Sequence, residues 1–281
     1  MKKHLPFSGG GLKHADTEHV DTSRVNTSRV NTLRAGSLRF DMSRVITLTR
    51  KEIFQYLNAP AFYGAAVFFL VFCSVWLFYL QRYFAMDQAT LRPYFGIFPV
   101  VFILVIPVIT MKSWAEERKT GTVELLLTMP FSEWDLVLGK FLSAFSMLCV
   151  MLLLTVPLPL SLLSLGRFDA GTIFCEYLGA FLLGAAAIAL GLLMSCLSKN
   201  QGGAFLGSAI VLMAVMLADQ ITKIFSLPDW LAQGINFFSL AYHFESFTKG
   251  LIDSRDLAFF ILSTAMFLFI NTRVILFRKW R

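Results

Sequence analysis

Acidic and basic side chains crowd into one short polar segment of the chain, residues 116–124. Its order is Glu-Glu-Arg-Lys-Thr-Gly-Thr-Val-Glu, and long apolar runs lie on both sides of it. Charges of both signs at this density can pair with a complementary surface, so the chemistry that they offer is ionic docking. The alternative is an ordinary solvated connector, and charge alone leaves both interpretations open.

The groups that catalysis or ion-coupled transport would need are missing from the apolar runs. Ionisable side chains are costly inside a membrane and mark working sites when they occur there. The central stretches of the runs contain no Asp, Glu, Lys, Arg or His, and Glu176 and Asp219 fall at predicted helix ends. The sequence also lacks a GxxxxGK[ST] phosphate loop. We therefore expect no bound cofactor, and any ATP and Mg²⁺ would be bound by a partner subunit.

Histidines and cysteines give no sign of a metal site. No two histidines have the helical spacing of a ligand pair, and the cysteines show no CxxC spacing. The histidines are His4, His14, His19 and His243, and the cysteines are Cys73, Cys149, Cys175 and Cys196. Each cysteine falls in or beside a predicted membrane span, where a lone thiol behaves as a small apolar group.

Six charge-free runs are available to position the polar segment. About 20 apolar residues span the hydrocarbon core of a membrane as a helix. The chain has 281 residues, of which 56% are hydrophobic and 15% charged. We predict an all-α integral membrane protein with six transmembrane helices, at approximately residues 60–81, 93–111, 139–165, 173–198, 202–219 and 257–277.

The positions of Lys and Arg predict the orientation of these spans. With six spans, 19 of the 25 basic residues fall on the side that holds both termini. Basic residues collect on the cytoplasmic side, so both termini and the polar segment should be cytoplasmic. We attribute the net charge of +7 to this bias and to contact with anionic membrane lipids, not to nucleic-acid binding.

Short amphipathic segments precede the first and the last span. Residues 43–58 are predicted to form an amphipathic elbow helix, with Ile46, Ile53 and Leu57 on one face that can lie in the membrane interface. The outward segment 219–256 contains an apolar run that is too short to cross the membrane. We therefore predict interfacial helices before the sixth span.

The polar segment itself is predicted to be an elbow between two helices. Helical order is expected over residues 114–128, with Gly121 as a weak point and Pro130 as the stop. Ser132 and Asp135 have the spacing of a capping box, so the next helix should begin near Glu133.

Small residues recur at four-residue spacing in the fourth and fifth spans. This spacing lets helix backbones approach closely, and packing within one subunit is favoured over a dimer seam. The pairs are Ala180 with Gly184, Ala187 with Gly191, and Gly203 with Gly207.

Residues 1–41 form a tail with a five-residue register, in which arginines recur at 24, 29, 34 and 39. A pentapeptide-repeat β-helix is disfavoured, because six copies make little more than one coil and Thr occupies the inward position. We interpret the tail as disordered and separate from a transmembrane domain at 42–281. A further hypothesis is that the natural start is Met42, which mass spectrometry of the native N-terminus would test.

The polar segment and its surroundings carry a resemblance to a known family. Glu-Glu-Arg-Lys-Thr-Gly-Thr-Val-Glu-Leu-Leu-Leu-Thr-Met-Pro at 116–130, followed by Trp-Asp-Leu-Val-Leu-Gly-Lys-Phe at 134–141, resembles the hallmark of ABC-2 type permeases, the membrane subunits of a large class of ABC transporters. Arg50-Lys51-Glu52 is a further match. Residues 242–257 resemble in particular the gliding-motility-associated branch. The resemblance covers the chain from Met42 onward.

This resemblance implies a function and partners. The chain would be a permease subunit that couples ATP hydrolysis by a separate cytoplasmic ABC ATPase to export or translocation across the bacterial inner membrane. Family members are dimers of transmembrane domains, so a second permease copy or a related membrane subunit is expected. The chain itself would not be an enzyme. The competing hypothesis is a membrane anchor or scaffold of an ATP-driven motility or envelope complex without a transported solute.

The resemblance also implies where coupling occurs. In the family, the connector between the second and third spans rests against the ATPase. Matching positions place Glu116, Glu117, Gly121, Thr122 and Glu124 at or beside that partner. On this basis, reversing the charge of Glu117 and Glu124 is expected to weaken ATPase association without unfolding the spans.

Overall fold

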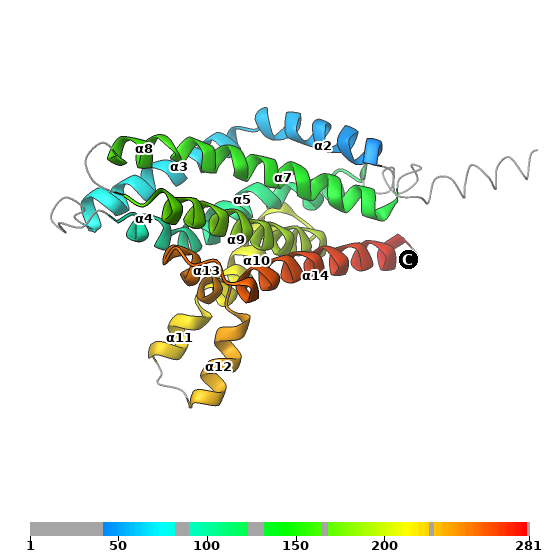
Figure 1. The fold of residues 1–281 in the computed structure, drawn as a ribbon. Coiled ribbons are helices and arrows are strands. Elements are labelled where there is room, and N and C mark those ends of the chain that lie inside the picture. The colour runs from blue at the N-terminus through cyan, green and yellow to red at the C-terminus, as the bar shows by residue number, and fades with distance from the viewer. Residues whose placement is uncertain (1–41, 82–89, 123–131, 164–167, 225–227, 280–281) are drawn as a thin grey trace, which may run out of the picture.

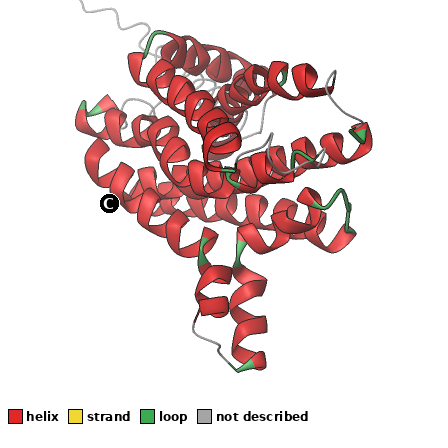
Figure 2. Cartoon of the chain, turned by 90° about the vertical axis from the view of Figure 1, so that its left-hand side faces the viewer, coloured by secondary structure: helices red, strands yellow, loops and turns green. Residues whose placement is uncertain are grey.

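The structure is a computed structural model that describes residues 42–81, 90–122, 132–163, 168–224 and 228–279. Every regular element in these ranges is a helix (Figure 2). Five helical stretches among the described residues are long and apolar enough to cross a membrane. An all-helical membrane protein is therefore confirmed. The predicted tail at 1–41 and Glu124 lie outside the described residues.

The long helices run side by side and form one bundle, from which α11 and α12 project (Figure 1). The candidate spans are α3 with the π-helical turn η1, α5, α7 with α8, α9, and α14. The bounds are α2 (Met42–Leu57), α3 (Pro60–Val75), η1 (Trp76–Leu80), α4 (Arg92–Gly96), α5 (Phe98–Lys119), α7 (Glu133–Thr155), α8 (Pro157–Leu163), α9 (Ala170–Leu197), α10 (Gln201–Met216), α11 (Ala218–Ile224), α12 (Asp229–Phe238), α13 (Leu240–Thr248) and α14 (Ser254–Lys279).

Side-chain caps fix where several of these helices begin. The Ser132 hydroxyl accepts a hydrogen bond from the Trp134 amide, and the Asp135 carboxylate accepts one from the Ser132 amide at 3.0 Å. This is the predicted capping box, and the predicted start of a helix at Glu133 is confirmed. Asp169 caps α9 in a similar way by accepting the amide of Gly171 at 2.9 Å.

Glycines let α9 lie against several neighbours at once. A Cβ atom at each of three positions would collide with a side chain of a different helix, so a larger residue there would require that neighbour to move. The pairs are Gly179 with Phe247 of α13, Gly184 with Leu148 of α7, and Gly191 with Thr110 of α5. The small residues of α9 therefore pack within one subunit, as the sequence predicted.

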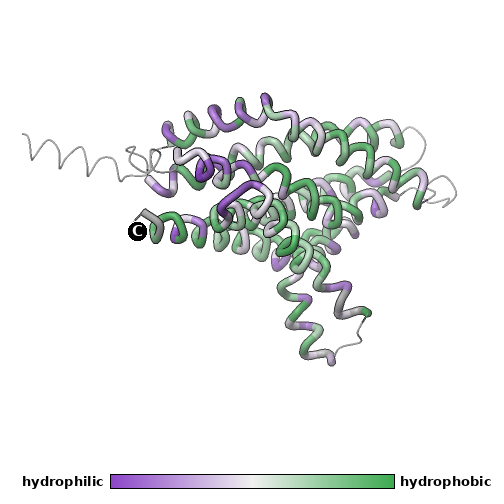
Figure 3. Tube along the Cα trace, turned by 180° about the vertical axis from the view of Figure 1, so that it is seen from behind, coloured by the Kyte–Doolittle hydropathy of each residue, from purple (hydrophilic) through white to green (hydrophobic). Residues whose placement is uncertain are grey.

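The first helix, α2, lies along α7 at one edge of the bundle. Gly139 of α7 leaves room for the Leu48 side chain of α2, and the Thr49 hydroxyl donates to the carbonyl of Gly139 at 3.3 Å. A second face of α2 exposes Ile46 and Leu57, whereas Ile53, which was expected beside them, is partly buried and packs against the core. Hydrophilic residues gather on α2 and at the end of the bundle that holds the C-terminus (Figure 3).

Candidate functional site

The predicted polar segment forms the end of α5. The helix stops at Lys119, and Gly121, the predicted weak point, follows with a φ of 72°; residues 123–128 of the predicted helical stretch lie outside the described residues. That left-handed conformation favours glycine. The Thr120 amide bonds to the carbonyl of Glu116 at 3.0 Å, and the Gly121 amide bonds to that of Arg118 at 3.3 Å. Gly121 therefore acts as a helix-ending glycine.

Two threonine hydroxyls complete this helix end. Thr120 Oγ1 lies 3.1 Å from the carbonyl oxygen of Glu116 and 3.2 Å from that of Glu117. Thr122 Oγ1 donates to the Glu117 carbonyl at 3.2 Å, and the two hydroxyl oxygens are 2.9 Å apart. The last carbonyls of a helix lack partners within it. The Thr-Gly-Thr sequence satisfies them and thereby fixes where α5 ends.

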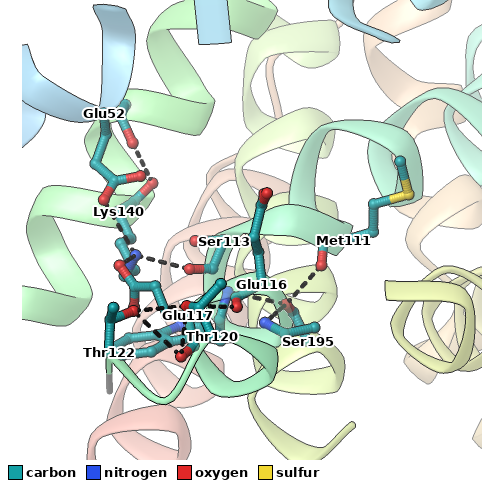
Figure 4. Close-up of polar contacts among 12 residues, drawn as sticks. Glu52, Met111, Ser113, Glu116, Glu117, Thr120, Thr122, Lys140 and Ser195 are labelled. Atoms are coloured by element: carbon teal, nitrogen blue, oxygen red, sulfur yellow. Dashed lines mark hydrogen bonds and ion pairs between the residues drawn. The ribbon is translucent and has the colours of Figure 1, made fainter. Parts of the chain in front are cut away.

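Behind this end lies a buried ion cluster centred on Lys140 of α7 (Figure 4). Its Nζ atom is 2.7 Å from Oε1 of Glu117 in α5 and 3.1 Å from Oε1 of Glu52 in α2. It also donates to the carbonyl of Ser113 at 2.7 Å and lies 4.8 Å from the centroid of the Trp114 ring. We call Glu52, Glu117 and Lys140 the Lys140 cluster. It joins three helices through a single ammonium group.

The charged side chains of the Lys140 cluster are buried, so each depends on its partners in the cluster for charge compensation. The exposed fractions are 1% for the Lys140 side chain, 5% for Glu52 and 16% for Glu117. Removing one partner of a buried ion pair leaves a charge that is neither hydrated nor paired. Burial, and to a smaller extent the Glu52 carboxylate, raise the pKa of the adjacent Tyr56 phenol above its ordinary value, so this group is neutral.

The same end of α5 is attached to α9. The Arg118 guanidinium donates to the carbonyl of Ser198 at 2.5 Å and also to that of Cys196. A cation at a helix C-terminus complements the helix dipole and satisfies its last carbonyls. The Ser195 hydroxyl donates to the carbonyl of Met111 at 3.3 Å. The end of α5 is therefore fixed to α2, α7 and α9.

Two adjoining hollows separate α2 from the end of α5. One has a volume of about 370 Å³ and reaches Pro60, and the other, of about 560 Å³, is bordered by Thr122. We call them together the α2–α5 groove. The residues that line both hollows are Gln55, Asn58, Glu116 and Glu117.

The structure gives the two adjacent glutamates different surroundings. Glu117 turns toward Lys140, whereas Glu116 points away from it (Figure 4). Glu116 is half-exposed, and the described residues offer its carboxylate no ion pair. Charge reversal at Glu117 would place a second cation beside Lys140, so this substitution would disturb the fold as well as any docking surface.

Four of the five predicted site residues meet at the end of α5: Glu116, Glu117, Gly121 and Thr122. Glu124 lies outside the described part of the chain. Sequence reasoning did not select Glu52 or Lys140. A signal for Lys140 was present, because it is a lone cation among the apolar residues of 136–142. Lys140 also lies in the segment 134–141 that carries the family resemblance, but neither signal assigned it to the site.

One membrane carboxylate lies apart from this site. Glu176 was expected at a helix end, and it lies in the second turn of α9 with 1% of its surface exposed. Neither of its carboxylate oxygens has a hydrogen-bond partner within the described ranges. Among the described residues, no group of three or more His, Cys, Asp or Glu side chains could hold a metal ion.

Comparison with known proteins agrees with this architecture. A family model for ABC-2 family transporter proteins matches residues 17–270. Two relatives, each a probable multidrug ABC transporter permease named YbhR, come from Escherichia coli K12 and Escherichia coli O157:H7. Each is 28% identical over 145 residues, which cover 51% of this chain and 39% of the relative. The match thus spans less than half the length of these relatives.

The family match has a wider extent than the match to the two relatives. It begins inside the five-residue repeats and continues through most of α14, so it includes α2, the end of α5 and the Lys140 cluster. It covers far more than half of the 281 residues. The chain therefore belongs to the ABC-2 family of transporter proteins.

Proposed function

We propose that the chain is the membrane-spanning permease subunit of an ABC transporter, driven by a separate cytoplasmic ABC ATPase. The observation that carries this proposal is the end of α5, which is fixed to α2, α7 and α9 and borders an open groove. A rigid end of this kind converts a push from a docked partner into a tilt of the attached helices. Similarity to probable multidrug permeases supports export as the direction.

The proposed topology has six crossings, with both termini on the cytoplasmic side of the bacterial inner membrane. The crossing added to the five candidate spans is α10, the fifth in chain order, whose 16 residues are fewer than the about 20 of a typical span. Its outward face is apolar, since Leu206, Ile210 and Met213 are all exposed. In this arrangement α2 is the elbow helix, with Ile46 and Leu57 toward the lipid.

The ATPase is proposed to dock on the α2–α5 groove. Glu116 and Lys51 border the groove and offer charges of both signs to a partner surface. Glu117 would hold the groove in shape through Lys140, without touching the partner. A second permease copy, or a related membrane subunit, completes the proposed transporter.

Charge reversal of Glu116 tests this docking surface. The protein is expressed with its ATPase, and Glu116→Lys is compared with Gln233→Lys, a control at an exposed position of α12. We expect Glu116→Lys to reduce ATPase co-purification several-fold with an unchanged melting temperature, because Glu116 has no ion pair within the described residues. Normal co-purification and normal hydrolysis with Glu116→Lys would contradict the proposed docking surface.

The second candidate function is a membrane anchor of an ATP-driven motility or envelope complex. It is favoured by the resemblance of residues 242–257 to gliding-motility-associated permeases. Reconstitution of the permease with its ATPase in lipid vesicles separates the two functions. Stimulation of hydrolysis by a candidate solute supports export, whereas hydrolysis that responds to none of a broad panel supports the anchor.

A further inference from the structure

A second hollow lies between α12, α13 and α14, on elements that take no part in the α2–α5 groove. Its volume is about 1050 Å³. Figures 1 and 2 show α12 projecting from the bundle and α14 running along it, with α13 between them in the chain. Apolar side chains dominate its walls, among them Phe237 and Phe238 of α12 and Phe259, Leu262 and Met266 of α14. We call it the α12–α14 crevice.

The crevice follows one face of α14. Its lining residues Phe259, Leu262, Ser263 and Met266 recur three or four positions apart, which places them on a single helical stripe. The distance along the helix from Arg255 to Met266 is about 16 Å at 1.5 Å per residue. That length is about half of the roughly 30 Å hydrocarbon core, the depth of one leaflet.

The crevice opens sideways along this stripe. Leu262 is 67% exposed and Met266 is 50% exposed, although both lie within a candidate membrane span. A groove that is apolar along a span and charged at the end of the span has the polarity profile of a single leaflet. It therefore suits a molecule that has a polar head and a hydrocarbon chain.

Polar contacts keep the walls of the crevice in place. Nδ1 of His243 lies 2.6 Å from Oδ1 of Asp256, and Nε2 lies 3.1 Å from the carbonyl oxygen of Phe237. The imidazole ring also stacks on Phe259 with a centroid distance of 3.8 Å. His243 in α13 thus contacts both α12 and α14 and ties the walls of the crevice together.

The mouth of the crevice carries the carboxylates of Glu245, Asp253 and Asp256 and the cations Lys249 and Arg255. Lys249 is paired with Glu245 at 3.0 Å. Asp253 accepts the backbone amide of Arg255 at 2.9 Å and so caps α14. The Arg255 side chain is exposed, lines the crevice and has no ion pair among the residues that the structure describes. A guanidinium group binds phosphate well because its planar fork can donate two hydrogen bonds to it.

We propose that the α12–α14 crevice binds an acidic phospholipid of the membrane, with its phosphate at Arg255 and one acyl chain along the α14 stripe. The aromatic walls and the adaptable side chain of Met266 suit a flexible hydrocarbon chain. The site is formed by elements other than the end of α5, so it is independent of the proposed coupling to an ATPase.

Photolabelling of the full chain tests this site. The protein is placed in nanodiscs of phosphatidylcholine that contain a small share of phosphatidylglycerol with a diazirine near the end of one acyl chain. After irradiation, labelled peptides are located by mass spectrometry. We expect labelling of residues 259–267, and Arg255→Gln should reduce it about 3- to 10-fold. The matched control is Arg273→Gln, which removes the same exposed charge at the other end of α14 and should leave the labelling unchanged.

A steric variant gives a second measurement. Ser263→Trp fills the crevice and should abolish labelling of the stripe, whereas Ala265→Trp, at an exposed position outside the crevice, should not. Equal labelling by phosphatidylcholine with the same diazirine would show nonspecific surrounding lipid and overturn the proposal. It would also be overturned if Arg255→Gln labelled like the wild type, or if cross-linking showed a second copy of the chain covering the stripe. The lipid comparison remains decisive if the tryptophan variant fails to fold.

Discussion

Replacing Lys140 by Met tests whether the Lys140 cluster holds α2, α5 and α7 together. The ammonium group lies 2.7 Å from one carboxylate and 3.1 Å from the other. With an effective dielectric constant of roughly 20, these separations correspond to gross attractions of about 6 and 5 kcal/mol. Desolvation of the three charges offsets most of this energy, so the net contribution is much smaller.

Lys140→Met removes both attractions and leaves the carboxylates of Glu52 and Glu117 buried without a counter-charge. Breaking a buried ion pair from one side typically costs about 3–5 kcal/mol. For a chain of this size, that loss corresponds to a decrease in melting temperature of about 6–20 °C. The melting temperature can be measured by heating the detergent-purified protein and quantifying the monodisperse fraction by size-exclusion chromatography.

Two further variants show whether electrostatics is the cause. Lys199→Met removes an exposed cation that has no ion pair within the described residues, so its melting temperature should equal that of the wild type. Replacing Glu52, Glu117 and Lys140 by Met together removes all three buried charges and should recover most of the lost stability. The reasoning is refuted if Lys140→Met melts like Lys199→Met, or if the triple variant is no more stable than Lys140→Met alone.

Three further predictions concern the same assay. Gly139→Val should lower the free energy of unfolding by about 1–3 kcal/mol, because its side chain would collide with α2. Gly64→Val meets open space and should lower it less. Equal losses would show that α2 does not pack closely against Gly139. Arg118→Gln should lower the free energy of unfolding by about 1–2 kcal/mol, because hydrogen bonds to the carbonyls at the end of α9 are lost. Lys119→Gln should leave it unchanged. Equal stabilities of the two variants would show that Arg118 does not stabilise the end of α9. Glu176→Leu should raise the melting temperature, because it removes a buried carboxyl group that has no hydrogen-bond partner among the described residues. A decrease would show that the carboxyl group forms stabilising hydrogen bonds when the protein is in the membrane.

Local rules explain which parts of the fold could be predicted from the sequence. The capping box at Ser132 and Asp135 depends on residues three positions apart, so the start of α7 was predictable. Gly184 and Gly191 each lie four residues after an alanine, a spacing that is typical of close packing, and the structure supplies a neighbour on another helix for both. These features need no knowledge of how distant helices are arranged.

The Lys140 cluster could not be predicted in the same way. Its members are separated by 88 and 23 residues in the chain, and they meet only because α2, α5 and α7 adopt particular rotations. Adjacent residues of a helix point about 100° apart, so the rotation of α5 decides whether Glu116 or Glu117 faces inward. Sequence reasoning placed both glutamates at one site, and the structure separates their surroundings.

The order of synthesis gives the Lys140 cluster a consequence for biogenesis. Glu52 is made first and Lys140 follows 88 residues later, which takes roughly 4–18 s at about 5–20 residues per second. Until then, the carboxylates of Glu52 and Glu117 lack the Lys140 ammonium group that pairs with both, and α2 has no α7 to lie against. The nascent chain must therefore insert its first helices before α2 can be fixed, so the earliest helix of the bundle is among the last to reach its final position.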